Sequence, residues 1–133
     1  MITIRRSEER HHIAGENQKT WMTFDSENKA DPLRDGFGAL KVFNEEVLNP
    51  GRSFTLHTHK DMVVVTYVNE GIMIFNRPRL GKTGLMEMGD FHHSYSLSGS
   101  KQYSLNASPS DEARLFQSGF TPGTGVQEPG GEK

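Results

Sequence analysis

Short apolar runs separated by turn residues fill positions 40 to 120, and this alternation restricts the fold more than any other feature of the chain. The clearest run, "MVVVTYV" at 62–68, is rich in β-branched residues and is closed by the turn sequence "NEG". No segment keeps a helical period over three turns, and "DEARLF" at 111–116 is the best helical candidate. Many short strands at close spacing predict an all-β barrel or sandwich.

The two ends of the chain contribute differently to this prediction. "MITIRR" at 1–6 and "TWMTF" at 20–24 alternate enough to be strands, with a polar connection expected between them. The segment 121–133, "TPGTGVQEPGGEK", is too polar and too rich in Gly and Pro to join a core, so we expect a flexible C-terminal tail. A chain of 133 residues fits one domain, which we place at 1–120.

Charge and cysteine content exclude several classes of protein. The 15 basic and 17 acidic residues give a net charge of -2 without a long block of one sign, so we expect no nucleic-acid partner and no membrane surface. The absence of cysteine removes a disulfide framework, a thiolate zinc site and a cysteine nucleophile. The N-terminus lacks the apolar core of a secretory signal and no run is long enough for a bilayer, so we expect a cytoplasmic protein.

Two histidines stand two residues apart in the expected strand "FTLHTHKDM" at 54–62. Side chains at i and i+2 of a strand point to the same face, so His57 and His59 are expected side by side. Two imidazoles on one face can supply two of the ligands of a transition metal. The alternative is an exposed polar face that happens to include histidine.

The flanking residues resemble the two motifs of the cupin superfamily. Gly51 leads into the strand with both histidines and Gly71 closes the following run; downstream, "EMGDFHHSY" has Gly89 and, three residues later, His92. The block 31–71, "DPLRDGFGALKVFNEEVLNPGRSFTLHTHKDMVVVTYVNEG", resembles the N-terminal domain of the pirins, a family of two-domain cupins. This chain has room for one such domain.

The resemblance implies a single antiparallel jelly-roll barrel with a metal in its mouth, and in some members a dioxygenase activity on quercetin. His57 and His59 fall on two pirin metal ligands, whereas the other two ligand positions hold Ser104 and Asn106 and the glutamate of the general cupin motif is Val63. We therefore expect His92 to complete a three-histidine site for one divalent ion, Fe, Ni, Cu or Zn.

Two functions remain open on these grounds. The first is a metal-dependent dioxygenase acting on a quercetin-like small molecule, for which no catalytic residue is identified beyond the ligands. The alternative is a non-catalytic cupin that binds a small ligand or regulates a partner, with a degenerate metal site, because the expected ligand positions hold poor ligands. The run "MVVVTYV" is apolar on both faces, which indicates a core strand or a strand covered by a second subunit. Because an isolated jelly roll has strand edges to protect, we expect a homodimer.

Overall fold

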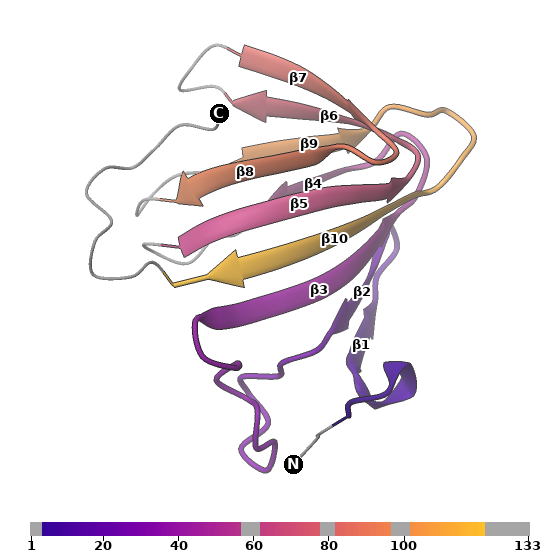
Figure 1. Cartoon of the computed structure of the whole chain (residues 1–133). Helices are drawn as coiled ribbons and strands as arrows, with labels where there is room; N and C mark the ends of the chain where they lie inside the picture. The colour runs from indigo at the N-terminus through magenta and orange to yellow at the C-terminus, as the bar shows by residue number, and fades with distance from the viewer. Residues whose placement is uncertain (1–3, 57–61, 78–81, 97–101, 122–133) are drawn as a thin grey trace.

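Antiparallel strands make up most of the chain in the computed structural model, which describes residues 4–56, 62–77, 82–96 and 102–121 (Figure 1). A single turn of 3₁₀ helix, η1 (Ser7–Glu9), precedes the first strand. The strands are β1 (His11–Ala14), β2 (Gln18–Met22), β3 (Leu40–Leu48), β4 (Ser53–Leu56), β5 (Met62–Glu70), β6 (Ile72–Arg77), β7 (Lys82–Glu87), β8 (Phe91–Ser96), β9 (Gln102–Asn106) and β10 (Ala113–Phe120). The prediction of an all-β protein is confirmed.

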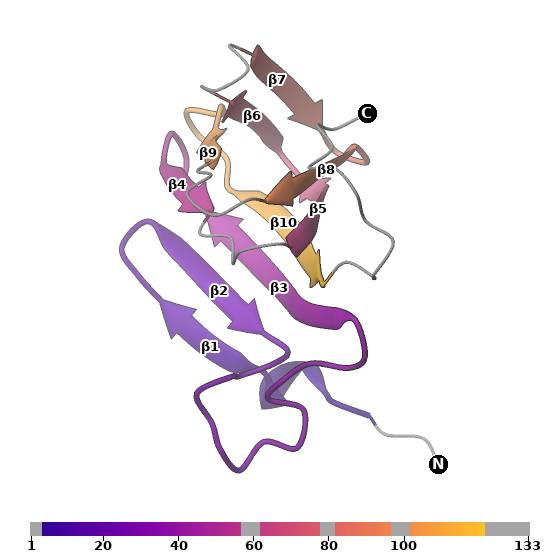
Figure 2. The ribbon, with the colours of Figure 1, turned by 90° about the vertical axis from the view of Figure 1, so that its left-hand side faces the viewer.

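These strands form two sheets. The larger has the order β1-β2-β3-β10-β5-β8, and the smaller has the order β4-β9-β6-β7. All pairings are antiparallel. Figure 2 shows β1 and β2 extending the larger sheet beyond β3. The arrangement is the antiparallel jelly roll that the cupin resemblance implies.

The core lies between the two sheets and is built by strict alternation. Along β5 and β10 every second side chain is buried, and the intervening side chains are half-buried on the opposite face. Because β10 is hydrogen-bonded to β3 on one side and β5 on the other, its inward side chains occupy the centre of the larger sheet. The main cluster of buried residues comprises Leu48, Val68, Met73, Phe75, Met86, Ala113 and Leu115.

Gly71 makes the sharp passage from β5 in one sheet to β6 in the other. Its φ of 94° lies in the left-handed region that favours glycine. A Cβ atom added there would lie 3.0 Å from Cα and Cβ of Ala113, so β10 leaves little room for a side chain at this turn. Both constraints explain the glycine that ends the run "MVVVTYVNEG".

Two sequence predictions are wrong. The first strand, β1, lies in the stretch expected to be a polar connection, whereas residues 4–6 are not in a strand. The helical candidate "DEARLF" contributes its last four residues to β10. Pairing on both edges of β10 outweighs the helix propensity of Ala, Arg and Leu, because propensity is weak beside tertiary contacts.

The predicted flexible tail at 121–133 lies outside the described residues except for Thr121. Within the described ranges, no helix is both long and apolar enough to cross a bilayer.

Candidate functional site

His92 of β8 faces the space between the two sheets. It is the register partner of Thr66 on β5, whose side chain is buried. Its ring stacks on Phe75 of β6, with the centroids 5.0 Å apart and 16° between the planes. His92 therefore reaches from the larger sheet to the smaller one, as an inward ligand would. His93 is exposed on the opposite face of the strand, as alternation predicts.

His57 and His59 lie outside the described residues, in the segment 57–61 between β4 and β5. Among the residues that the structure does describe, no group of three or more histidine, aspartate or glutamate side chains could hold a metal ion. Of the three predicted ligands, the described part of the chain thus contains only His92. The three-histidine site remains a prediction.

The three positions at which ligands are replaced have different environments. Val63 is the register partner of Tyr95 and Phe120 and alternates with the buried residues of β5, so it lies on the outer face. A carboxylate at this position would point away from the space between the sheets. Ser104 is buried on β9 beside its register partner Phe75, the residue on which His92 stacks.

Asn106 is a structural residue of the barrel end. Its Nδ2 donates to the main-chain oxygens of Leu48, Asn49 and Asp111, at 3.2, 3.2 and 2.8 Å, and its Oδ1 accepts from the amide of Ser108 at 3.0 Å. The residue is 1% exposed. Its amide thus joins the loop after β3 to the loop before β10. Asn106 therefore has a structural role, whereas the resemblance implies a metal ligand at this position.

A row of polar side chains crosses the inner face of the larger sheet. Register places Asn44 of β3 opposite Gln117 of β10, Gln117 opposite Thr66 of β5, and Thr66 opposite His92. Gln117 Nε2 lies 3.4 Å from Thr66 Oγ1, and both side chains are buried. Sequence reasoning missed Gln117 and Asn44, because the small and polar residues at the inward positions of "ARLFQSGF" obscure the apolar alternation of a strand.

A cavity of about 490 Å³ opens at the Asn44 end of this row. Its apolar lining comes from Met22, Phe24, Val42, Met62 and Val64. Its polar lining includes Asn44, Gln117, Arg34, Lys41 and Asp35. A volume of this size suits a small organic ligand. Two cations against one carboxylate favour a ligand with negative charge.

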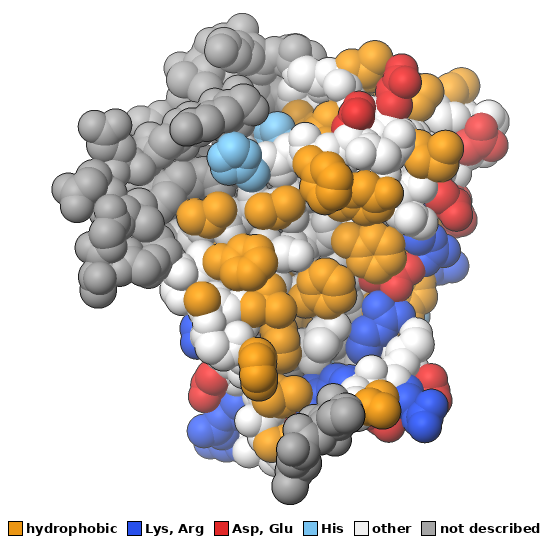
Figure 3. All heavy atoms as spheres, viewed as in Figure 1, with side chains coloured by type: hydrophobic (Ala, Val, Ile, Leu, Met, Phe, Trp, Pro, Cys, Tyr) orange, Lys and Arg blue, Asp and Glu red, His pale blue; other side chains and the backbone are white. Residues whose placement is uncertain are grey.

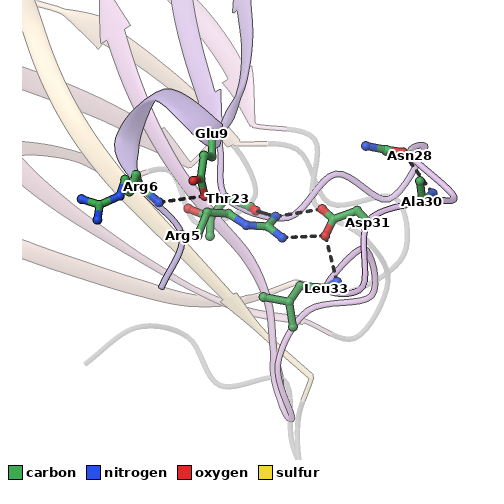
Figure 4. A network of polar contacts seen from close by, with 8 residues as sticks. All are labelled: Arg5, Arg6, Glu9, Thr23, Asn28, Ala30, Asp31 and Leu33. Atoms are coloured by element: carbon green, nitrogen blue, oxygen red, sulfur yellow. Dashed lines mark hydrogen bonds and ion pairs between the residues drawn. The ribbon is translucent and has the colours of Figure 1, made fainter. Parts of the chain in front are cut away.

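The loop between β2 and β3 forms one wall of the cavity and is held by an ion pair (Figure 4). Arg5 donates two hydrogen bonds to the carboxylate of Asp31, at 2.8 and 2.6 Å, and one to the main-chain oxygen of Thr23, at 2.6 Å. Asp31 also accepts from the amide of Leu33 at 2.9 Å. The Arg5 guanidinium, followed by this amide, holds the pKa of Asp31 well below its usual range.

Glu46 is a buried carboxylate on β3, one inward position from Asn44. It is 4% exposed and accepts hydrogen bonds from Gln18 Nε2 and Thr20 Oγ1, each at 2.6 Å. Burial raises the pKa of Glu46, and the two hydrogen bonds partly oppose that shift. The larger sheet therefore carries a second polar position inside its core.

The two facing antiparallel sheets, with polar residues and a histidine between them, define a cupin. A family model for the pirins matches residues 4–118, and the chain belongs to the pirin family. The quercetin 2,3-dioxygenase of Escherichia coli K12 is 33% identical over 122 residues, covering 92% of this chain and 52% of that protein. A pirin-like protein of Caulobacter vibrioides is 34% identical over 92 residues, covering 69% of this chain and 39% of the relative.

Solved structures agree with this assignment. YhhW of E. coli superposes with a TM-score of 0.83 at 32% identity, covering 96% of this chain and 54% of that one. The same bacterial pirin in complex with nickel(II) gives a TM-score of 0.81, also at 32% identity, over 96% of this chain and 55% of the other. The chain thus spans about half the length of these relatives.

Proposed function

We propose that this chain is a metal-dependent dioxygenase of the pirin family that acts on a quercetin-like aromatic substrate. The observation that carries the proposal is the inward position of His92, stacked on Phe75 and in register with the polar row that leads to the cavity. The relatives named quercetin 2,3-dioxygenase and the nickel(II) complex of a bacterial pirin support it.

The donor set suits a divalent transition metal. His57, His59 and His92 would hold the ion through imidazole nitrogen, which binds Fe, Ni, Cu and Zn. When bound, such an ion supplies Lewis acidity and redox chemistry. The inward imidazole of His92 fits this role, since a ring fixed by stacking is already oriented.

The chain's own residues would bind and orient the substrate. Gln117 is two strands from His92 along the inner row, about 10 Å at the usual strand spacing. The amides of Gln117 and Asn44 can donate to or accept from the hydroxyl and carbonyl groups of a flavonol. Arg34 and Lys41 at the rim would attract an ionised phenol or enol.

The positions at which the expected ligand residues are replaced favour a second function. Asn106 is committed to main-chain oxygens and Val63 faces outward, so neither can coordinate an ion in the barrel. A pirin with this site would bind a small molecule or regulate a partner without catalysis. We also propose that the chain acts in the cytoplasm as a homodimer and that residues 1–120 form its cupin domain.

Metal content and oxygen consumption separate the two functions. The dioxygenase predicts about one metal per chain after loading with Ni(II) or Fe(II), and quercetin-dependent oxygen uptake. His92→Ala should lower both, whereas His93→Ala, a change of the same residue type on the outer face, should keep the metal. Protein that cannot be loaded with any of the four metals contradicts the enzyme. Failure to load agrees with the binding function, whose metal site is degenerate, whereas stoichiometric metal with no oxygen uptake would contradict the dioxygenase and leave the metal site standing.

A further inference from the structure

The outer face of the larger sheet is apolar over its central strands (Figure 3). Outward positions alternate with the buried ones on β5 and β10, and β3 and β8 lie on either side. Phe91 is 71% exposed and Phe43 is 37% exposed, so the face is open to solvent in a single chain. Its apolar members include Phe43, Val65, Tyr67, Phe91 and Phe116.

The aromatic rings on this face are contiguous. Phe116 of β10 is in register with Tyr67 of β5, and Tyr67 with Phe91 of β8. The rings of Tyr67 and Phe91 are 4.7 Å apart between centroids, and those of Phe43 and Phe116 are 6.2 Å apart. Contiguous exposed apolar patches of this kind mark interaction sites on soluble proteins.

We infer that a second copy of this chain covers the face, so that the larger sheets of two protomers pack against each other. This interface rests on the homodimer proposed above and specifies where it forms.

The size of the face suits a dimer. The strands β3, β10, β5 and β8 have nine, eight, nine and six residues. At the usual rise and spacing of strands they cover on the order of 500 Å² in projection. Because the side chains project from the sheet, the accessible area of the face is larger than its projected area. The accessible area therefore approaches the ~800 Å² per partner that a standard interface buries.

The charges beside the aromatic row suit a two-fold arrangement. Arg114 of β10 and Glu70 of β5 are register partners at the same end of the face, next to Phe116 and Tyr67. A two-fold axis parallel to the strands, between β10 and β5, would place each β10 over the partner's β5. Phe116 would then meet the partner's Tyr67. Arg114 already donates to Glu45 of its own chain, and its remaining N–H groups would meet the partner's Glu70.

Site-specific cross-linking tests this interface, because the natural chain has no cysteine to react in the background. Ser118 is the outward register partner of Val65, beside the proposed axis. Ser118→Cys should give a covalent dimer with a short thiol cross-linker. Leu85→Cys, at an exposed position of β7 in the other sheet, should not.

Mass measurement by light scattering completes the test. The natural chain and Leu85→Glu should have twice the mass of one chain, whereas Phe91→Glu should raise the dimer dissociation constant at least tenfold with unchanged circular dichroism. A dimer that tolerates Phe91→Glu and fails to cross-link through Ser118→Cys overturns this interface and leaves the homodimer standing. A monomeric natural chain overturns both and assigns the face to another partner; metal content and oxygen uptake report separately on the enzyme.

Discussion

His92 of β8 stacks on Phe75 of β6 with the ring centroids 5.0 Å apart, so a predicted metal ligand of the larger sheet is held by a core residue of the smaller one. Phe75 is 5% exposed and belongs to the main apolar cluster. The orientation of the imidazole thus depends on the packing between the sheets. Changes at Phe75 should affect stability and metal binding together.

Replacing Phe75 tests that dependence. Phe75→Ala should lower the free energy of unfolding by about 3–5 kcal/mol, the usual cost of removing a buried aromatic ring. Phe75→Leu should cost less and still weaken metal binding by roughly tenfold, because the flat surface that orients His92 is lost. Urea denaturation and metal titration measure the two effects. Met86→Leu, a change in the same cluster away from the imidazole, is the control. Equal metal affinity in Phe75→Leu and Met86→Leu would show that Phe75 does not position His92.

Substitutions of Asn106 test whether its role is structural. Asn106→Ala leaves three main-chain oxygens without their shared donor and should destabilise the fold by about 2–4 kcal/mol, measured by urea denaturation. Asn106→Glu places a carboxylate where the pirin resemblance implies a metal ligand, yet it should destabilise the fold without raising metal affinity. A rise in affinity for Asn106→Glu would show that this position reaches the ion after all. Asn49→Ala, whose exposed side chain donates to the main-chain oxygen of Glu16, is the control and should cost less.

The sequence predicts well those elements that carry their own signal. The run that forms β5 is rich in β-branched residues, and the predicted span 62–68 lies within the observed strand Met62–Glu70. The strand β10 has Ala113, Gln117 and Gly119 on its inner face, which hides the alternation of apolar residues. Its place between β3 and β5 comes from pairings with residues 44 to 80 positions away, which local patterns do not encode.

The same limit applies to the candidate site. Alternation alone placed His92 and His93 on opposite faces, because that needs only one strand. The row from Asn44 to His92 needs the register of four strands, and the role of Asn106 needs two distant loops to meet at its amide. Family resemblance supplied a position for Asn106 in the alignment but could not supply its contacts.

Glu46 should make stability depend on pH. Because burial raises its pKa in the folded state, the folded chain keeps this proton after the unfolded chain, whose pKa is the ordinary value near 4.5, has lost it. The contribution of Glu46 to the free energy of unfolding therefore decreases as pH rises from its pKa in the unfolded chain through its higher pKa in the folded chain. Glu46→Gln has no proton to lose, so its stability relative to the natural chain should improve between pH 4 and pH 7 in urea denaturation. Glu16→Gln, a charge change on an exposed turn, is the control; a difference for Glu46→Gln that stays constant between pH 4 and pH 7 would contradict the prediction.

Asp31 should show the opposite dependence. Its pKa is depressed, chiefly by the hydrogen bonds from Arg5, so its stabilising effect is complete above the ordinary pKa of aspartate, about 3.9. The effect is lost as pH falls below that value toward the folded pKa. Asp31→Asn should thus lower the melting temperature at pH 7 and pH 5, with a smaller difference at pH 3. Asp35→Asn, whose side chain is 84% exposed in its ion pair with Arg34, should change little at any pH.

Gln117 should set the preference of the cavity for hydroxylated ligands. Its side chain is 3% exposed. The side chain lines the cavity, and its Nε2 donates to Oγ1 of Thr66, its neighbour in the inner row. Gln117→Leu keeps the approximate volume and removes the amide, so loss of one hydrogen bond should weaken quercetin binding by roughly three- to tenfold. Calorimetry under anaerobic conditions measures the dissociation constant without turnover. Glu112→Gln, an exposed change ahead of the same strand, should leave binding unchanged, and an unchanged constant for Gln117→Leu would exclude this amide from the binding site.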